Sequence, residues 1–357
     1  MQTSKPLRQA MTSRQRLLTA GRCEPCDRVP VSPFGLGRLD PDGVEAAELI
    51  AECDPFLETW LDVNFFGGLN FREESVQEGD LLKATIHTPR GPLTRTVKRT
   101  AVARHMIEFP CKGRADLEKY LSIPWKAPAP NAAPYERLRE RWGEKALALV
   151  GCPDAICMPA ELLSPQDFCL LWADEPAFMR ELVAEAARRV ETVAEAACRA
   201  GVRGFRVIGG EYASVQLGPR AFDELVVEHD RRLVEIMHRH GAVAYYHNHG
   251  PMMRYLEPIA QIGIDYLDPL EVPPFGDADL ARAARIIDGR YCVVGTFDDM
   301  EVLEKWPVVR IEKAAREHLR LFGSRGLCLG GSASGTYTER AARAFRAMAQ
   351  VAREMPC

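Results

Sequence analysis

The chain has 357 residues, of which 46% are hydrophobic and 27% are charged, so it is long enough to bury one large core or two ordinary ones. Its net charge of -4 gives no electrostatic case for binding to nucleic acid or to an anionic membrane, since both require a concentrated basic face. No apolar run approaches the roughly 20 residues of a membrane span, and no apolar signal segment follows the polar start, so we expect a cytoplasmic protein that acts on small molecules.

The N-terminal part predicts a helix, a strand and a second helix after a tail. Residues 1–12 are polar at their start and predict a disordered tail. Residues 13–20 follow as a short helix, for which Ser13 is the expected N-cap. The segment RVPVSPF, residues 28–34, predicts the first strand, and the second helix is expected at residues 42–52.

Residues 71–110 have a different pattern from the rest of the chain. Apolar and polar side chains alternate on both sides of the turn sequence Pro89-Arg90-Gly91-Pro92, which is typical of a β-hairpin. We therefore expect residues 71–110 to form a hairpin that is inserted into the main domain as a flap.

From residue 147 onward, expected strands alternate with expected helices. The helical patterns at residues 181–201 and 222–241 each end at or beside a glycine, as helix C-termini commonly do. An eighth strand fits between residues 53 and 70. Repeated βα units predict an α/β fold, a TIM-like (β/α)8 barrel that spans residues 13–357, whereas a dinucleotide-binding fold lacks support because SPFGLGRLD has no third glycine. The strands expected after the first are residues 147–157, 204–210, 242–249, 265–271, 291–298 and 326–331.

The segment VAYYHNHGPM, residues 243–252, carries two histidines at the end of an expected strand. Residues i and i+2 of a strand point to the same side, so His247 and His249 present both imidazoles to one place. His238 and His240 have the same spacing but lie on an expected helix, where i and i+2 point in different directions. Since catalytic groups of barrels lie at strand ends and imidazole is a common metal ligand, the first pair predicts a divalent metal site.

A catalytic metal commonly takes a third protein ligand, which a neighbouring strand end can supply. Four side chains stand at such positions: Glu211, Glu271, Asp298 and Cys328. The alternative is that the histidines bond to backbone groups and that the acids cap helices, which is the favoured interpretation for Asp298. Tyr246 or Tyr212 is expected to close the pocket.

Three segments resemble the uroporphyrinogen decarboxylase superfamily. Its opening, a helix and a turn before a DRxPV strand, is similar to SRQRLLTAGRCEPCDRVPVSP. The H-x-C-G segment and the next strand of its corrinoid-related methyltransferase branch are similar to YYHNHGPMMRYLEPIAQIGIDYLDPLEVPPFGDADL, and a G-N-I-D strand is similar to RYCVVGTFDDMEVL. The resemblance covers nearly all of residues 13–357 and implies a TIM-like barrel.

The methyltransferase branch, as the resemblance implies, binds zinc through the His and Cys of H-x-C-G and through a late Cys. In this sequence His247 keeps the first position, His249 replaces the Cys, and Cys328 is the candidate for the late thiol. A site made of two His and Glu211 or Glu271 has harder ligands, in the sense of hard and soft donor atoms, than a site with thiolates. It therefore suits activation of a water, alcohol or ether oxygen.

The sequence departs from true uroporphyrinogen decarboxylases where these bind the substrate carboxylates. In place of an Arg-Gln-Ala-Gly-Arg-type segment it has GLGRLDPDG, which retains at most Arg38. Residues 328–336 read CLGGSASGT and lack the late histidine of those enzymes. Decarboxylation of a porphyrinogen is therefore not the expected activity.

We expect a metal-dependent methyltransferase or demethylase-like enzyme that acts on a small methylated substrate, with Zn²⁺ or another divalent metal as cofactor and a corrinoid protein as methyl partner. One alternative is a metal-independent carboxy-lyase in which Asp298, Glu211 and Arg206 manage charge and protonation. A second alternative is a non-catalytic barrel that binds a tetrapyrrole or a corrinoid. A homodimer is the expected default for a protein of this kind.

Overall fold

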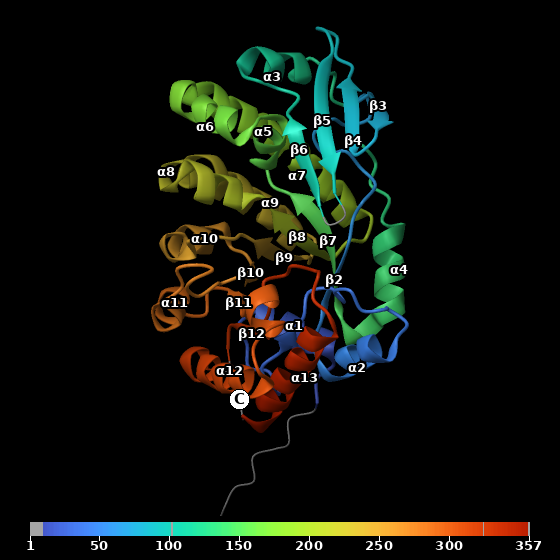
Figure 1. Ribbon diagram of the computed structural model, residues 1–357. Coiled ribbons are helices and arrows are strands. Elements are labelled where there is room, and N and C mark those ends of the chain that lie inside the picture. The colour runs from blue at the N-terminus through green and yellow to red at the C-terminus, as the bar shows by residue number, and fades with distance from the viewer. Residues whose placement is uncertain (1–9, 101–102, 324, 356–357) are drawn as a thin grey trace, which may run out of the picture.

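The computed structural model describes residues 10–100, 103–323 and 325–355. Eight parallel strands form a nearly closed barrel with helices around it, and four antiparallel strands form a separate sheet at one side (Figure 1). The predicted TIM-like (β/α)8 barrel is therefore confirmed. Residues 1–9 of the predicted tail lie outside the described residues. Within the described ranges, no helix is both long enough and apolar enough to cross a membrane.

The barrel strands follow one another in the order β1-β12-β11-β10-β9-β8-β7-β2, and all pairs are parallel. A bridge between Phe34 and Phe56 closes the seam from β1 to β2. Successive side chains of a strand point to opposite faces, so alternate residues fill the lumen while the others contact the helices. The strands are β1 Val31–Ser32, β2 Phe56–Thr59, β7 Leu147–Pro153, β8 Gly204–Ile208, β9 Val243–His247, β10 Tyr266–Asp268, β11 Cys292–Thr296 and β12 Leu327–Gly330.

Helices cover the outside of the barrel because each presents an apolar face to the strands. In α7, for example, Leu182, Ala186, Val190 and Val193 recur at helical spacing and are buried. The larger helices are α2 Val44–Glu52, α3 Arg114–Leu121, α4 Ala133–Trp142, α6 Pro165–Asp174, α7 Pro176–Arg199, α9 Glu228–Arg239, α11 Leu280–Ile287, α12 Val308–Phe322 and α13 Glu339–Glu354. Shorter helical segments are α5 Cys157–Leu162, α8 Pro219–Phe222, α10 Leu256–Ile262, η1 Gly143–Lys145, η2 Tyr212–Leu217, η3 Asp223–Val227, η4 Met252–Arg254 and η5 Asp299–Leu303.

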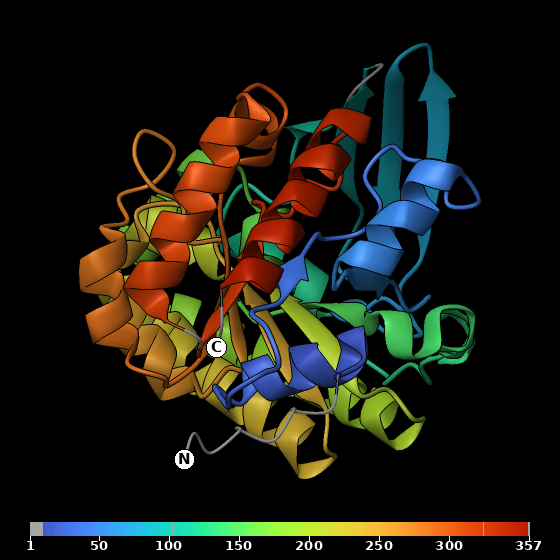
Figure 2. The same cartoon turned by 90° about the horizontal axis from the view of Figure 1, so that it is seen from below.

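The first helix, α1 Ser13–Gly21, closes the N-terminal end of the barrel. Leu17 and Ala20 pack among the side chains that fill the lumen, and the hydroxyl of Tyr266 donates to the carbonyl of Leu17 at 2.7 Å. Seen from below, α1 lies across the ends of the strands (Figure 2). The barrel is therefore open at its C-terminal end and plugged at the other.

The N-cap of α1 is Thr12 and not Ser13, which corrects the prediction. The Thr12 hydroxyl accepts from the Gln15 backbone N–H at 3.1 Å, and the Gln15 side chain accepts from the Thr12 N–H at 3.1 Å. These reciprocal bonds form a capping box, and only the residue three positions before Gln15 can make it. Ser13 instead donates to the carbonyl of Cys53.

The inserted segment lies within the predicted residues 71–110, but it has four strands where a hairpin has two. The predicted turn does join two strands, β4 Leu81–Ile86 and β5 Leu93–Arg99, but these are flanked by β3 Glu73–Glu78 and β6 Arg104–Glu108. The β3 sequence, EESVQE, is almost entirely exposed, so it lacks the alternation of apolar and polar residues by which a half-buried strand is recognised.

Candidate functional site

The lumen of the barrel changes from apolar to polar along its length. Phe56, Tyr245 and Tyr266 pack together in its lower part with ring centroids 4.8 to 5.9 Å apart. Two residues further along the same strands come Glu58, His247 and Asp268, which therefore point to the same side. We call this C-terminal end the mouth, and its inward polar side chains are Ser32, Glu58, Arg206, His247 and Asp268.

His247 is held in the mouth by a carboxylate on the neighbouring strand. The β9 and β10 strands pair in register at His247 and Asp268, and His247 Nδ1 lies 2.8 Å from Asp268 Oδ2. Because a carboxylate only accepts, Nδ1 carries the proton of this bond and Nε2 is left without one in the neutral ring. Burial lowers the pKa of His247, against the opposing effect of the Asp268 carboxylate, so the neutral form is favoured.

His249 repeats this arrangement at the rim of the mouth. Its Nδ1 lies 3.2 Å from Glu271 Oε2, and its ring centroid lies 4.6 Å from that of His247 with the two planes nearly perpendicular. Burial lowers the pKa of His249, but the hydrogen bond with Glu271 and the charges of Asp268 and Glu211 outweigh it and raise the pKa. Two histidines and Glu271, all predicted from the sequence, are thus brought together.

The two histidines have the chemistry of metal ligands. In metal sites the imidazole that binds through one nitrogen typically donates its other N–H to a carboxylate, which fixes both the tautomer and the ring orientation. Both Nδ1 atoms here have such a partner, and neither Nε2 is bonded to a described residue. No group of three or more His, Cys, Asp or Glu suited to a metal ion occurs in the described parts of the chain. The donor set fits a metal with two protein ligands and open positions, but it does not fit the predicted three-ligand set.

Cys328 lies away from the histidines, in the apolar part of the lumen. It is fully buried with Tyr245, Tyr266 and Val294, and its Sγ lies 3.6 Å from Cys292 Sγ. The expectation that Cys328 completes the metal site is therefore corrected by the structure. Its strand position puts the side chain below the polar end of the lumen, among other groups that avoid water.

Tyr246 also lies outside the mouth, because it precedes His247 and points to the opposite face of β9. Its hydroxyl donates to Asp230 Oδ2 on α9 at 2.7 Å, and Asp230 in turn bonds to Asp154. Burial raises the pKa of Asp154 well above its ordinary range and that of Asp230 to about 7. Tyr246 therefore belongs to a buried carboxyl cluster behind the site, and the prediction that it closes the pocket is corrected.

Asp230→Asn is expected to stabilise the protein above neutral pH by more than about 1 kcal/mol. Between the pKa of an unfolded aspartate, about 4, and the folded pKa of about 7, the folded protein holds a proton that the unfolded chain has released, so the free energy of unfolding falls as the pH rises. An asparagine needs no proton and still accepts from Tyr246.

Urea unfolding at about pH 5.5 and about pH 8 measures how the free energy of unfolding changes with pH. The control is Asp223→Asn, which replaces an exposed aspartate. An unchanged slope in Asp230→Asn contradicts this account.

Glu211 and Asp298 have different surroundings. Glu211 follows β8, and its carboxylate lies near enough to His249 to raise the pKa of that ring, while its Oε2 is buried without a hydrogen-bond partner. Asp298 accepts from the backbone N–H groups of Met300 and Glu301, so it is an N-cap, in agreement with the alternative interpretation. The sequence analysis missed its buried neighbour Asp299, which bonds to the loop after β12.

Buried polar atoms without a partner identify the binding surface of the mouth. Buried polar groups are nearly always hydrogen-bonded, so orphans gathered in one place indicate where a ligand completes the bonding. The orphans in the lumen are Ser32 Oγ, Glu58 Oε1 and Arg206 Nε; Asp268 Oδ1 and the Tyr245 hydroxyl also lack a close partner, but these two side chains lie within hydrogen-bonding reach of each other. Glu58 and Asp268 were not predicted. The sequence signal for Asp268 was its position in β10, the strand that pairs with the strand of His247, two residues after the buried Tyr266.

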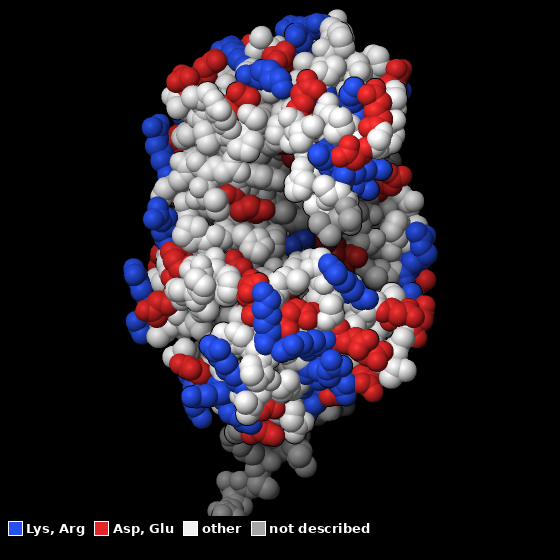
Figure 3. Space-filling model, in the orientation of Figure 1, with Lys and Arg blue, Asp and Glu red and all other residues white. Residues whose placement is uncertain are grey.

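A cavity of about 380 Å³ adjoins the mouth. It is lined by Pro153 and Ile208, which end β7 and β8, and by the side chains of Trp60 and Tyr212. Ile208 pairs with His247 across the β8–β9 ladder, so the cavity lies beside the histidines. Figure 3 shows a recess on this face below the antiparallel sheet, with acidic and basic side chains in its depth. The volume is within the range of small-molecule sites.

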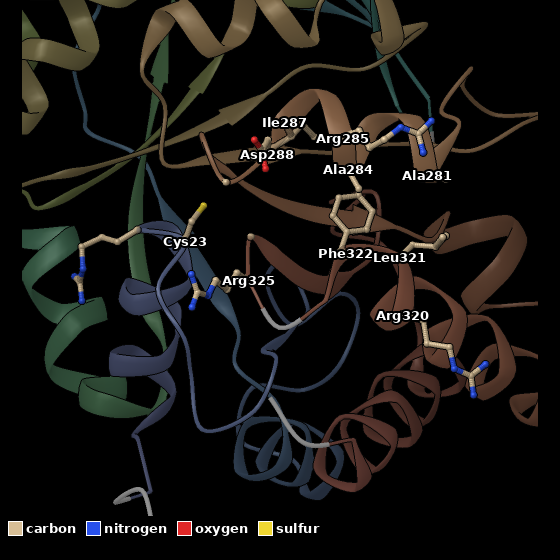
Figure 4. A pocket seen from close by; sticks show the side chains of 13 residues that line it. Cys23, Ala281, Ala284, Arg285, Ile287, Asp288, Arg320, Leu321, Phe322 and Arg325 are labelled. Atoms are coloured by element: carbon tan, nitrogen blue, oxygen red, sulfur yellow. The ribbon is translucent and has the colours of Figure 1, made fainter.

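A larger cavity, of about 690 Å³, lies at the opposite end of the barrel. It is lined by Cys23, Arg285, Arg320 and Arg325, from the segments that lead into the strands (Figure 4). The side chains of Arg285 and Arg320 point away from Arg325, so these cations do not converge on one ligand. Because barrels carry their chemistry at the C-terminal ends of the strands, the mouth is the candidate site despite its smaller volume.

Comparisons with known proteins agree with the barrel fold. The profile of the uroporphyrinogen decarboxylase (URO-D) family matches residues 137–355. A search of curated proteins gave no significant match. Among solved structures, a methyltransferase from Methanosarcina mazei is similar with a TM-score of 0.67 and 16% identity over 95% of this chain and 98% of that chain. A B12-independent methionine synthase from Shewanella sp. W3-18-1 has a TM-score of 0.45 and 14% identity over 58% of this chain and 62% of that chain. The first similarity shows the same fold over nearly the whole chain.

Proposed function

Because this chain belongs to the uroporphyrinogen decarboxylase family, we propose that its mouth catalyses the metal-dependent transfer of a methyl group between a small methylated substrate and a corrinoid carried by a partner protein. The single observation that carries this proposal is the pair of carboxylate-held histidines, His247 with Asp268 and His249 with Glu271. Two neighbouring imidazoles that each keep Nε2 free are the ligand arrangement expected of a Lewis-acid site.

His247 and His249 would hold Zn²⁺ or another divalent ion through Nε2. Such an ion would supply Lewis-acid stabilisation of the substrate heteroatom that loses the methyl group to the corrinoid. Asp268 and Glu271 keep the two rings in the required tautomer and orientation. The His247 side chain is 8% exposed and is shielded from water, whereas the His249 side chain is 41% exposed and faces the opening of the mouth.

The size of the site supports a small substrate and a separate corrinoid protein. A cavity of about 380 Å³ is at the small end of the range for ligand pockets. A corrinoid ring is too large to share that space with a substrate, so it must approach the mouth from outside. A carrier protein that docks over the C-terminal face presents the cobalt at the required position.

Metal content tests this proposal. The purified protein is expected to contain close to one divalent ion per chain by inductively coupled plasma mass spectrometry, and the double variant His247→Ala/His249→Ala is expected to contain almost none. The matched control is His238→Ala/His240→Ala, a pair with the same spacing at the end of α9. It should keep the wild-type metal content. Equal metal in wild type and in the His247/His249 double variant would overturn the proposal.

One observation favours a carboxy-lyase as a second candidate. Arg206 is buried in the mouth with an unbonded Nε, and a buried guanidinium of this kind can hold a substrate carboxylate and accept the negative charge that decarboxylation moves. This activity predicts release of CO₂ from a polycarboxylate after metal has been removed by chelation. The methyltransferase predicts no turnover in the same preparation.

A further inference from the structure

Arg206 differs from the other buried arginines of the described residues. Arg16 bonds to Asp27 at 2.7 and 2.8 Å, to Asp54 at 2.5 Å and to a carbonyl. Arg189 bonds to Glu185 at 2.7 Å and to the carbonyl of Phe66. Arg206 is 8% exposed, yet its one bond is a 3.5 Å contact from Nη1 to Glu58, and its Nε has no partner.

The guanidinium of Arg206 is held in place although its bonding is incomplete. The side chain leaves β8 and extends into the lumen, where its Cζ lies 4.5 Å from the ring centroid of Phe34 beyond the end of β1. This stacking fixes the plane of the group on one face. The Glu58 contact restrains Nη1, so the edge that carries Nε is the part left free for another molecule.

A further orphan donor lies beside Phe34. Ser32 is two residues before Phe34, on β1, and has an unbonded, buried Oγ. Tyr245 packs against Phe34 with ring centroids 5.7 Å apart, but its hydroxyl lies within hydrogen-bonding reach of Asp268, so it does not need a ligand. A ligand with acceptor oxygens in this part of the mouth would complete the bonding of Arg206 and Ser32, whereas a purely structural ion pair would leave Ser32 unexplained.

We propose that Arg206 is the receptor for a carboxylate of the substrate, with Ser32 as an additional hydrogen-bond donor. The inference deepens the proposed function by naming a substrate class, a small methylated carboxylic acid, and it rests on that function only in taking the mouth as the active site. The edge of a guanidinium matches the two oxygens of a carboxylate.

Charge selects a carboxylate over a phosphate. Arg206 supplies one positive charge, while Glu58 and Asp268 stand beside it. Both acids repel any anion, but the repulsion on a dianionic phosphate is larger than that on a singly charged carboxylate, and one guanidinium offsets the smaller charge better. The receptor is therefore suited to a monoanion with planar geometry.

Acetate is the probe for the test, because it carries the carboxylate alone. Binding is measured by saturation-transfer NMR on the methyl signal of acetate, at one pH, with the protein as purified. Arg206→Met is expected to weaken acetate binding by about tenfold or more, and Arg206→Lys to restore part of it. Glu58→Gln removes the competing carboxylate and is expected to tighten binding by about threefold or more. The control is Arg285→Met, an arginine of the cavity at the other end of the barrel.

The inference is overturned if Arg206→Met binds acetate within twofold of wild type, or if Arg285→Met weakens binding equally. It is also overturned if inorganic phosphate binds more tightly than acetate, or if only the loss of His247 and His249 abolishes acetate binding. The gain in Glu58→Gln cannot arise from a folding defect, so it separates a receptor from a structural role. Metal content of the same preparations keeps the two proposals apart: metal without acetate binding refutes the receptor alone, and acetate binding without metal refutes the metal site alone.

Discussion

Asp54→Asn is expected to lower the free energy of unfolding by about 3–5 kcal/mol. Asp54 is fully buried and accepts from Arg16 at 2.5 Å, from Arg28 at 2.6 Å and from the backbone N–H of Val31 at 3.1 Å. The neutral amide leaves the charge of Arg28 without its counterion and turns one accepting oxygen into a donor. Because Val31 begins β1, the loss also loosens the seam of the barrel. Urea or thermal unfolding measures the change.

A surface ion pair of the same chain provides the control for Asp54. Asp42 pairs with Arg141 at 2.6 Å, but its side chain is 84% exposed. Asp42→Asn should therefore cost less than about 1 kcal/mol, since solvent screens exposed pairs. Equal losses in Asp54→Asn and Asp42→Asn would show that burial does not strengthen the Asp54 cluster, contrary to the argument.

His247→Ala is expected to lower methyl transfer by about a thousandfold, because a bound metal contributes several kcal/mol of transition-state stabilisation. Asp268→Asn keeps the ligand but weakens its orientation, so it should lower metal affinity and turnover by about 10- to 100-fold. Turnover is measured with free cob(I)alamin as acceptor and a panel of methylated carboxylic acids as donors, and metal affinity by competition with a chelating dye.

Asp265→Asn is the matched control for Asp268→Asn. Asp265 also pairs with a histidine, His238, at 2.9 Å, but this pair lies at the start of β10 and outside the mouth. Its loss should leave metal affinity unchanged. If Asp268→Asn and Asp265→Asn behave alike, the carboxylate of Asp268 does not orient a metal ligand.

The barrel could be predicted from the sequence because its strands are short apolar runs at regular spacing between amphipathic helices. The parts that failed have local causes. Ser13 and Thr12 are both good capping residues, and only the position of Gln15 decides between them. The exposed strand β3 carries charges on both faces and has no pattern to recognise.

The residues of the site could be predicted where the alternation of side chains along a strand was applied. The prediction failed where that rule was not applied. His247 and His249 were found by it. The same rule places Tyr246 on the opposite face, so its exclusion from the mouth could have been read from the sequence. Cys328 required the height of β12 along the lumen, and the orphan on Arg206 required the three-dimensional positions of Phe34 and Glu58. Neither can be derived from one strand alone.

Helix α1 closes the N-terminal end of the barrel, so the lumen opens to solvent at the mouth. With Leu17 and Ala20 filling the N-terminal end, water that the substrate displaces must leave by the route through which the substrate enters. In the proposed reaction, a carrier protein docked over the mouth would close this route for as long as it stays. The proposal therefore predicts an ordered turnover, in which the substrate enters before the carrier docks and the demethylated product leaves after the carrier has gone.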